Sequence, residues 1–172
     1  AAKHTADSVD VAREMGRAHA RAYIDAITAK IHDDTESISV RVTLRNEGQS
    51  PAKAIVLFGA TEIVDVRLPI EPAPFASLHE GQAWGPLRSG GELTVPITCD
   101  STTRHFNAVE SAHGPLSIRA FGRVRYVTIF DEAYETEFSF HTNRARHMLK
   151  SGPDNTIVED PIIMSHEPVA LK

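Results

Sequence analysis

Residues 37–45 read Ser-Ile-Ser-Val-Arg-Val-Thr-Leu-Arg, and this stretch decides the fold. Apolar residues occupy every even position from Ile38 to Leu44, and polar residues occupy the odd positions. Successive side chains of a strand point to opposite faces, so the alternation predicts a strand with one buried and one wet face. An antiparallel sheet is the expected setting for such a strand.

Other stretches of the chain predict further strands around this one. They are residues 23–31, 54–58, 62–68, 93–98, 116–130 and 135–141. Turn signals separate them and no helical pattern alternates with them, which disfavours a parallel sheet. We therefore expect an all-β fold, an immunoglobulin-like antiparallel sandwich of about seven strands with an N-terminal helix. Arg119, Arg123 and Arg125 alternate with other residues and are expected on a wet sheet face.

The connections carry their own expectations. Residues 46–52 read Asn-Glu-Gly-Gln-Ser-Pro-Ala, where Asn and Gly are expected to supply left-handed backbone for a turn. Residues 69–91 are rich in proline and glycine and predict a long irregular loop. Pro96 favours an edge strand, and Gly122 marks either a bulge or a close backbone approach.

Composition shifts divide the chain into three parts. We expect an N-terminal helix or stalk over residues 1–21, the sandwich over 22–149 and an extended C-terminal tail over 150–172. The helical pattern runs from about residue 5 to 22, with Asp7 or Ser8 as its cap. Its narrow stripe favours a stalk or coiled-coil seam, or equally a helix frayed on the domain surface. The stripe consists of Val11, Met15, Ala18 and Ala22.

Four short motifs resemble those of a widespread, uncharacterised family of bacterial membrane-anchored proteins. They are Arg-Ala-Tyr-Ile at 21–24, Leu-Arg-Asn-Glu-Gly-Gln-Ser-Pro-Ala at 44–52, Gly-Arg-Val-Arg-Tyr at 122–126 and Thr-Glu-Phe-Ser-Phe at 136–140. Ser50 stands where that family usually has threonine. The resemblance implies an extracytoplasmic, periplasmic sandwich anchored to the inner membrane by helices upstream of Ala1. It implies no activity.

Composition and charge exclude several classes of protein. Of 172 residues, 41% are hydrophobic and 24% charged, which is ordinary for a globular chain. The net charge is −5 and no Lys/Arg run occurs, which disfavours nucleic acid as a partner. No apolar run is long enough to span a membrane. Cys99 is the single cysteine, so an intrachain disulfide is impossible.

No motif predicts catalysis or a cofactor. The nine histidines are scattered and lack the close spacing of a zinc site, so we expect no metal. The pairs His79-Glu80 and Asp131-Glu132 lie in expected loops, where such residues are usually solvated. No Gly-x-Ser-x-Gly turn or phosphate-binding glycine loop occurs. We expect no catalytic residue, no cofactor and no enzyme.

The remaining candidates are residues for contact with a partner. Trp84 is either a partner anchor or a cap on the open end of the sandwich. Ile162, Ile163 and Met164 form an apolar patch in the tail. We expect a non-enzymatic protein-interaction domain with a protein partner or a second copy, tethered through an upstream segment. The alternatives are a ligand-binding domain (for carbohydrate) or an enzyme that uses the 69–91 loop, and a structural subunit of a larger assembly.

Overall fold

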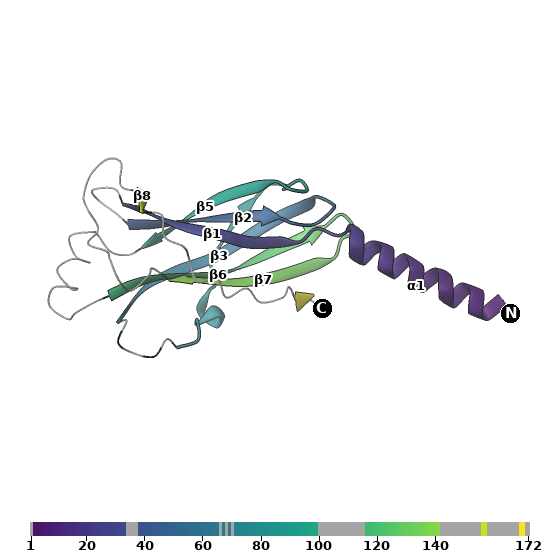
Figure 1. Cartoon of the computed structure of the whole chain (residues 1–172), viewed down its shortest axis with the longest axis horizontal. Coiled ribbons are helices and arrows are strands. Elements are labelled where there is room, and N and C mark those ends of the chain that lie inside the picture. Colours follow the sequence, from purple (N-terminus) through teal and green to yellow (C-terminus); the bar gives the residue numbers. More distant parts are fainter. Residues whose placement is uncertain are drawn as a thin grey trace.

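Two antiparallel sheets are stacked face to face in the computed structural model, and a helix projects from one end of the stack (Figure 1). The structure describes residues 2–33, 38–65, 67, 69, 71–99, 116–141, 156–157 and 169–170. Sheet A has the order β5-β2-β1-β8 and sheet B the order β4-β3-β6-β7-β9. The elements are α1 (Ala2–Ala20), β1 (Ile24–Asp33), β2 (Ile38–Asn46), β3 (Ala52–Asp65), a 3-10 turn (Phe75–Ser77), β4 (Gly81–Trp84), β5 (Glu92–Cys99), β6 (Leu116–Thr128), β7 (Ala133–His141), β8 (Thr156–Ile157) and β9 (Val169–Ala170). The predicted all-β sandwich with an N-terminal helix is confirmed.

Strand β2 shows the alternation that its sequence predicts. Ile38, Val42 and Leu44 are fully buried, whereas Arg41 is exposed. The buried side chains of β2 join one core cluster with those of sheet B, which include Val124 and Phe138. Burial of this apolar layer between the sheets is the main source of stability in such a sandwich.

Strand β3 differs from the expectation of two separate strands. Residues 52–65 form one strand that pairs with β6 along nearly its whole length, with one register shift between Ala52 and Ala54. Gly59 lies opposite Gly122 in this ladder, so the ladder passes without a break through a position where a turn was expected.

The expected irregular loop at 69–91 is largely ordered against sheet B. Residues 71–80, here called the strap, contain the 3-10 turn and lead into β4, which pairs with β3 at the sheet edge. Leu78 of the strap is buried and Phe75 is half-buried. Outside the 3-10 turn, the strap has no regular secondary structure, as predicted, whereas the prediction of an irregular loop is wrong for residues 81–84, which form β4.

Three expectations for residues of β6 and β5 can be compared with the structure. A Cβ atom on Gly122 would lie 2.6 Å from Cζ of Phe138, so this glycine permits a close approach, and the ladder shows no bulge there. Pro96 lies on β5, the edge strand of sheet A, as predicted. The expectation that Arg119 faces water is wrong, because only 2% of this residue is exposed.

Helix α1 begins at Ala2, so Asp7 and Ser8 lie inside the helix and do not cap it. Val11 is 56% exposed and Met15 59% exposed. The helix extends away from the sandwich (Figure 1), which corresponds to the stalk and not to a helix laid on the domain surface.

Two short segments of the tail add strands to the sheets. Thr156–Ile157 pairs with β1 at Ile31 and His32, and Val169–Ala170 pairs with β7 at Tyr134 and Glu135. Each segment continues one sheet by a single two-residue strand.

Candidate functional site

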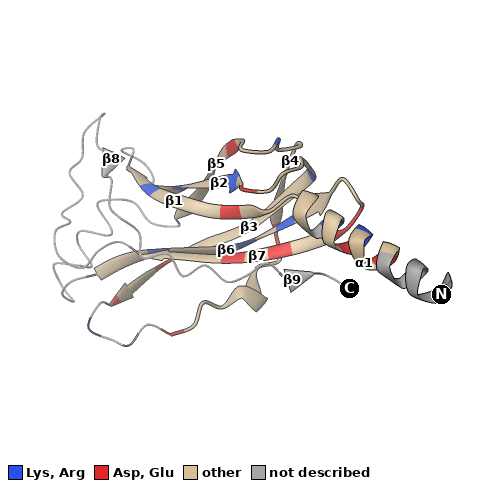
Figure 2. Cartoon of the chain, turned by 45° about the vertical axis from the view of Figure 1, so that its right-hand side comes forward, with Lys and Arg blue, Asp and Glu red and all other residues tan. Residues whose placement is uncertain are grey.

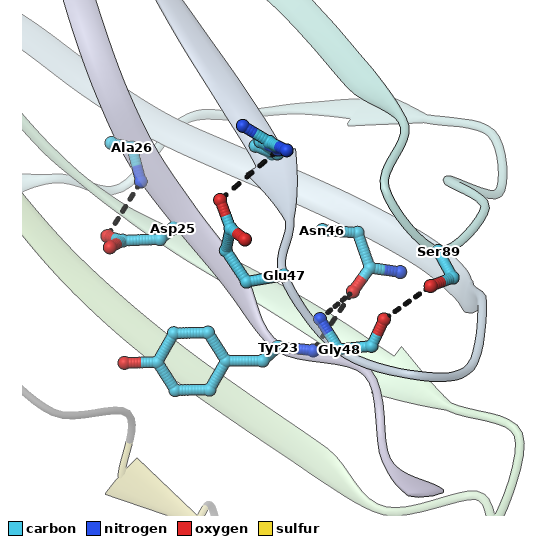
Figure 3. Close-up of polar contacts among 8 residues, drawn as sticks. Tyr23, Asp25, Ala26, Asn46, Glu47, Gly48 and Ser89 are labelled. Carbon is cyan, nitrogen blue, oxygen red and sulfur yellow. Dashed lines mark hydrogen bonds and ion pairs between the residues drawn. The ribbon is translucent and has the colours of Figure 1, made fainter.

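The end of the sandwich that carries α1, here called the helix pole, is fixed by one buried amide. Asn46 is fully buried, and its Oδ1 accepts hydrogen bonds from the backbone N–H of Tyr23 at 3.1 Å and of Gly48 at 3.0 Å (Figure 3). Its Nδ2 donates to the carbonyls of Ser50 at 2.8 Å and Leu87 at 3.1 Å. All the usual hydrogen bonds of a buried amide are thus made, and they join three chain segments.

Gly48 is required at this pole by space. A Cβ atom there would collide with the backbone of Arg21 and Tyr23. The expectation of left-handed backbone at residues 46 and 48 is wrong, because positive φ occurs among the described residues only at Gly90 and Asp131. The Asn-x-Gly turn that carries the family resemblance therefore has a structural role in this chain.

Two arginines connect α1 to the hairpin between β6 and β7. The guanidinium of Arg17 lies 5.9 Å from the ring centre of Phe130, and that of Arg21 lies 5.1 Å from the ring of Tyr134. The backbone N–H of Gln49 donates to the carbonyl of Arg21 at 3.2 Å. The cation–π contacts of Arg17 and Arg21, which are four residues apart, fix the orientation of the C-terminal end of α1 at the helix pole.

The outer face of sheet B is covered by the strap. Arg119 Nη1 donates to the carbonyl of Glu71 at 2.6 Å, and Arg123 Nη2 donates to the carbonyl of Leu78 at 2.8 Å. Phe75 packs edge-on against Phe121, with ring centres 6.0 Å apart. Both ends of the strap are held by charged donors, which form stronger hydrogen bonds than neutral ones.

A cavity of about 500 Å³ opens beside Arg119, between the end of β3 and the proline-rich start of the strap. Most of its charges are compensated within the chain: Arg119 Nε lies 2.8 Å from Oε1 of Glu62, and Asp65 pairs with Arg67. The carboxylate of Glu71, which is exposed at the cavity's edge, forms no ion pair with a described residue. His141 stands opposite Arg119 on β7, and burial together with the Arg119 charge lowers the pKa of its imidazole. The arginine at the centre of this cluster is thus already paired and bonded within the fold, and offers no free positive charge to a ligand.

The outer face of sheet A instead carries an open hollow of about 550 Å³. Three strands line it, β1, β2 and β5. Its lining residues are Ile27, Thr28, Lys30, Ile31, His32, Arg41, Thr43, Glu92 and Thr94. Thr28, Thr43 and Thr94 stand in one row across the strands, and the hydroxyls of Thr43 and Thr94 are 3.2 Å apart. No described residue outside these strands lines the hollow.

A bulge in β1 creates this surface. The β1–β2 register shifts between Ala26 and Thr28, which leaves Ile27 unpaired. Before the shift, even-numbered residues such as Ile24 are buried in the core. After the shift, the odd-numbered Ile31 is buried there instead. The bulge thereby turns Thr28 and Lys30 toward the outer face, since a shift of one residue exchanges the two faces of a strand.

Lys30 and Arg41, here called the cation pair, stand directly opposite each other in the hollow. Neither forms an ion pair with any described residue. Two rows away on the same face, Arg45 lies between Asp25 of β1 and Glu92 of β5. Arg45 also forms an ion pair with Glu47 at 3.2 Å. Burial raises the pKa of Asp25. The row of Lys30 and Arg41 therefore has two positive charges and no acidic residue beside them to balance these charges.

The residues expected to contact a partner fall in different places. Trp84 ends β4, opposite Ile55, and packs against the core cluster, while its Nε1 is buried without a hydrogen-bond partner. Ile162, Ile163 and Met164 lie outside the described residues. Trp84 does not line the hollow on sheet A. The residues that do line it were not predicted as a site from the sequence.

The pairs considered for acid–base chemistry are separate from each other and from the hollow. His79 and Glu80 are exposed in the strap. Asp131 has a φ of 61° in the β6–β7 turn and pairs with Lys53 at 2.7 Å. In the described part of the chain, no three His, Cys, Asp or Glu side chains are grouped so as to hold a metal ion.

Comparisons of the chain with family models, curated proteins and solved structures give no match. Within the described residues, α1 is not long and apolar enough to cross a membrane.

Proposed function

We propose that this chain is a non-enzymatic interaction domain that works outside the cytoplasm, tethered to the inner membrane through a segment upstream of α1. Its partner is a protein, and the outer face of sheet A binds it. The resemblance in four motifs supports the location, and the exposed helix that leaves one pole supports the tether. The observation that carries the proposal is the open hollow on sheet A beside an unbalanced cation pair.

We also propose that the sandwich is immunoglobulin-like. The first, second and fifth strands share one sheet, and the third, sixth and seventh share the other. This matches strands A, B, E and C, F, G of immunoglobulin domains, with β4 beside β3 where an additional strand joins the second sheet. In such domains, binding surfaces are found on sheet faces and loops carried by a rigid scaffold.

The two alternatives have less support. A ligand site in the 69–91 loop would use residues that Arg119, Arg123 and Phe121 already hold against sheet B. A structural subunit whose tail docks on a neighbour would leave its own edges free, yet Thr156–Ile157 and Val169–Ala170 lie on the sheets of the same chain.

Site-specific photo-cross-linking in bacterial cells tests the binding face. A photoreactive residue at Thr94 or Thr98, both exposed on sheet A, should give a discrete adduct with one protein. The matched control is Ala76, which is exposed on the strap and should give none. Adducts of equal yield at both faces, or none at Thr94 and Thr98, would contradict the proposed face.

Cysteine labelling tests the location. Cys99 is 6% exposed, so the unaltered chain should give little background with a membrane-impermeant maleimide. Ala76→Cys adds an exposed thiol away from the hollow, and it should be labelled once only the outer membrane is permeabilised. Labelling that appears only after lysis of the inner membrane would contradict a periplasmic domain.

A further inference from the structure

The cation pair is unfavourable in the protein alone. Like charges directly opposite each other across two strands destabilise a sheet. The other basic residues of the described sandwich have a carboxylate partner, apart from Arg88. The partners are Glu47 for Arg45, Asp131 for Lys53, Asp65 for Arg67, Glu62 for Arg119 and Glu135 for Arg123 and Arg125. In a chain of net charge −5, an anion from outside would supply the missing counter-charge.

The threonine row supplies hydrogen-bond donors next to the cation pair. The hydroxyls of Thr43 and Thr94 share one hydrogen bond, which uses one of their two protons. The second proton and the hydroxyl of Thr28 remain for a ligand. Glu92 lies at the other end of the hollow and accepts hydrogen bonds but donates none when ionised. The hollow therefore favours negative charge at one end and N–H donors at the other.

We infer that this hollow binds an extended acidic segment of the partner protein, with its carboxylates on Lys30 and Arg41. The inference rests on the proposed function and specifies the chemistry of its partner. A polypeptide brings both groups that the hollow favours, carboxylate side chains for the cation pair and backbone N–H donors for Glu92. The hydroxyls of the threonine row lie between them.

A lipid headgroup fits this place less well than a peptide. Lys30 stands six residues along β1 from Ile24 at the helix pole, which is about 20 Å at the usual rise of a strand. The hollow lies on the outer face of sheet A, along the side of the sandwich, whereas α1 leaves from its end (Figure 1). An anionic membrane beyond α1 would thus lie away from the cation pair, and Glu92 would repel further lipid phosphates.

Fluorescence anisotropy with a labelled hexaglutamate peptide tests the inference on the full chain at low ionic strength. Arg41→Gln should weaken binding about fivefold or more, as expected for loss of a charge-assisted contact. Arg88→Gln is the matched control, because Arg88 is also exposed and without an acidic partner but lies outside the hollow. Its affinity should stay within about twofold of the unaltered chain. Lys30→Gln provides a second variant with the same expectation as Arg41→Gln.

Four results would overturn the inference. Equal losses in the Arg41→Gln and Arg88→Gln variants, or no binding by the unaltered chain, would leave only general electrostatic attraction or none. Competition by inorganic phosphate at the same concentration as the peptide would make the hollow a small-anion site. Binding to phosphatidylglycerol vesicles that Arg41→Gln abolishes would make the partner a membrane.

Failure of the inference is distinguishable from failure of the proposed function. Cross-links at Thr94 without peptide binding would leave the binding face in place and remove the acidic ligand. Absence of cross-links on sheet A would remove the binding face itself. Thermal melting of the Arg41→Gln variant should match or exceed that of the unaltered chain, because the substitution removes a like-charge contact.

Discussion

The outer faces of the two sheets differ in the surroundings of particular arginines, Arg119 and Arg123 on sheet B and Arg41 on sheet A. On sheet B, Arg119 and Arg123 are paired with acids and donate to carbonyls of the strap. On sheet A, Arg41 is exposed beside Lys30 and forms no ion pair with a described residue. Lys and Arg positions, blue in Figure 2, occur on strands of both sheets. The strap covers the outer face of sheet B, whereas among the described residues only β1, β2 and β5 line the hollow on sheet A. This difference is the basis of our proposal that sheet B contributes to stability and sheet A to recognition.

Removal of Arg119 should have the largest effect on stability. Arg119→Ala leaves Glu62 without its counter-charge and the Glu71 carbonyl without its donor, at a cost of about 2–3 kcal/mol in unfolding free energy. Urea denaturation measures the cost, and Arg41→Ala is the matched control with an expected change below about 0.5 kcal/mol. Equal losses would remove the distinction between the faces.

Removal of the strap's aromatic contact should have a smaller effect. Phe75→Ala loses half-buried surface and the edge-on contact with Phe121, at a cost of about 1–2 kcal/mol. Limited proteolysis should also cleave within the strap more rapidly. Thr94→Ala on sheet A should leave both measurements nearly unchanged, whereas a matching loss there would mean that the hollow is also part of the packed structure.

The pH dependence of stability should be affected by His141 on sheet B. Its folded-state pKa is lowered from 6.5, so the unfolded chain binds a proton more readily. The stabilising contribution is therefore complete above pH 6.5 and is lost as the pH falls toward the folded-state value. His141→Gln should flatten this part of the curve, and His79→Gln, at an exposed strap residue, should not. An unchanged slope in His141→Gln would contradict the burial effect.

The smallest expected effect concerns the cation pair. Lys30→Gln should raise the unfolding free energy by a few tenths of a kcal/mol at low salt, since it relieves like-charge repulsion. Addition of about 0.5 M salt should remove the gain, because screening already weakens that repulsion in the unaltered chain. A loss of stability would show that Lys30 has a favourable role in the free protein.

The fold was predictable wherever the local pattern and the burial agree. The alternation in β2 identifies its inner face correctly, and Pro96 identifies an edge strand. The same reasoning failed for Arg119, because its neighbours in sequence give no sign of the strap that covers it from 48 residues away. It also failed for β3, where two strands at 54–58 and 62–68 were expected and one strand continues through Gly59, opposite another glycine.

The hollow was not predicted, although β1 contains a signal for it. Ile24 and Ala26 are two apart, as are Ala29 and Ile31, but the two pairs are out of phase. Such a slip within one strand indicates a bulge, and it assigns Lys30 to the outer face. The position of Lys30 opposite Arg41 depends on the register between strands, which the sequence alone does not specify. Trp84 was a candidate partner anchor because of its residue type, but it packs against the core cluster.

Strand β1 has a mechanical consequence, because it both lines the hollow and continues through Tyr23 into α1. A pulling force between a bound partner and the tether would act along β1, roughly parallel to the strands of sheet A (Figure 1). Tension in that direction loads the hydrogen bonds of the β1–β2 ladder together, in shear, and does not open them one after another. The amide of Asn46, bonded to Tyr23, stands where that tension would enter the sandwich, so in the proposed tethered and bound state it would carry part of the load.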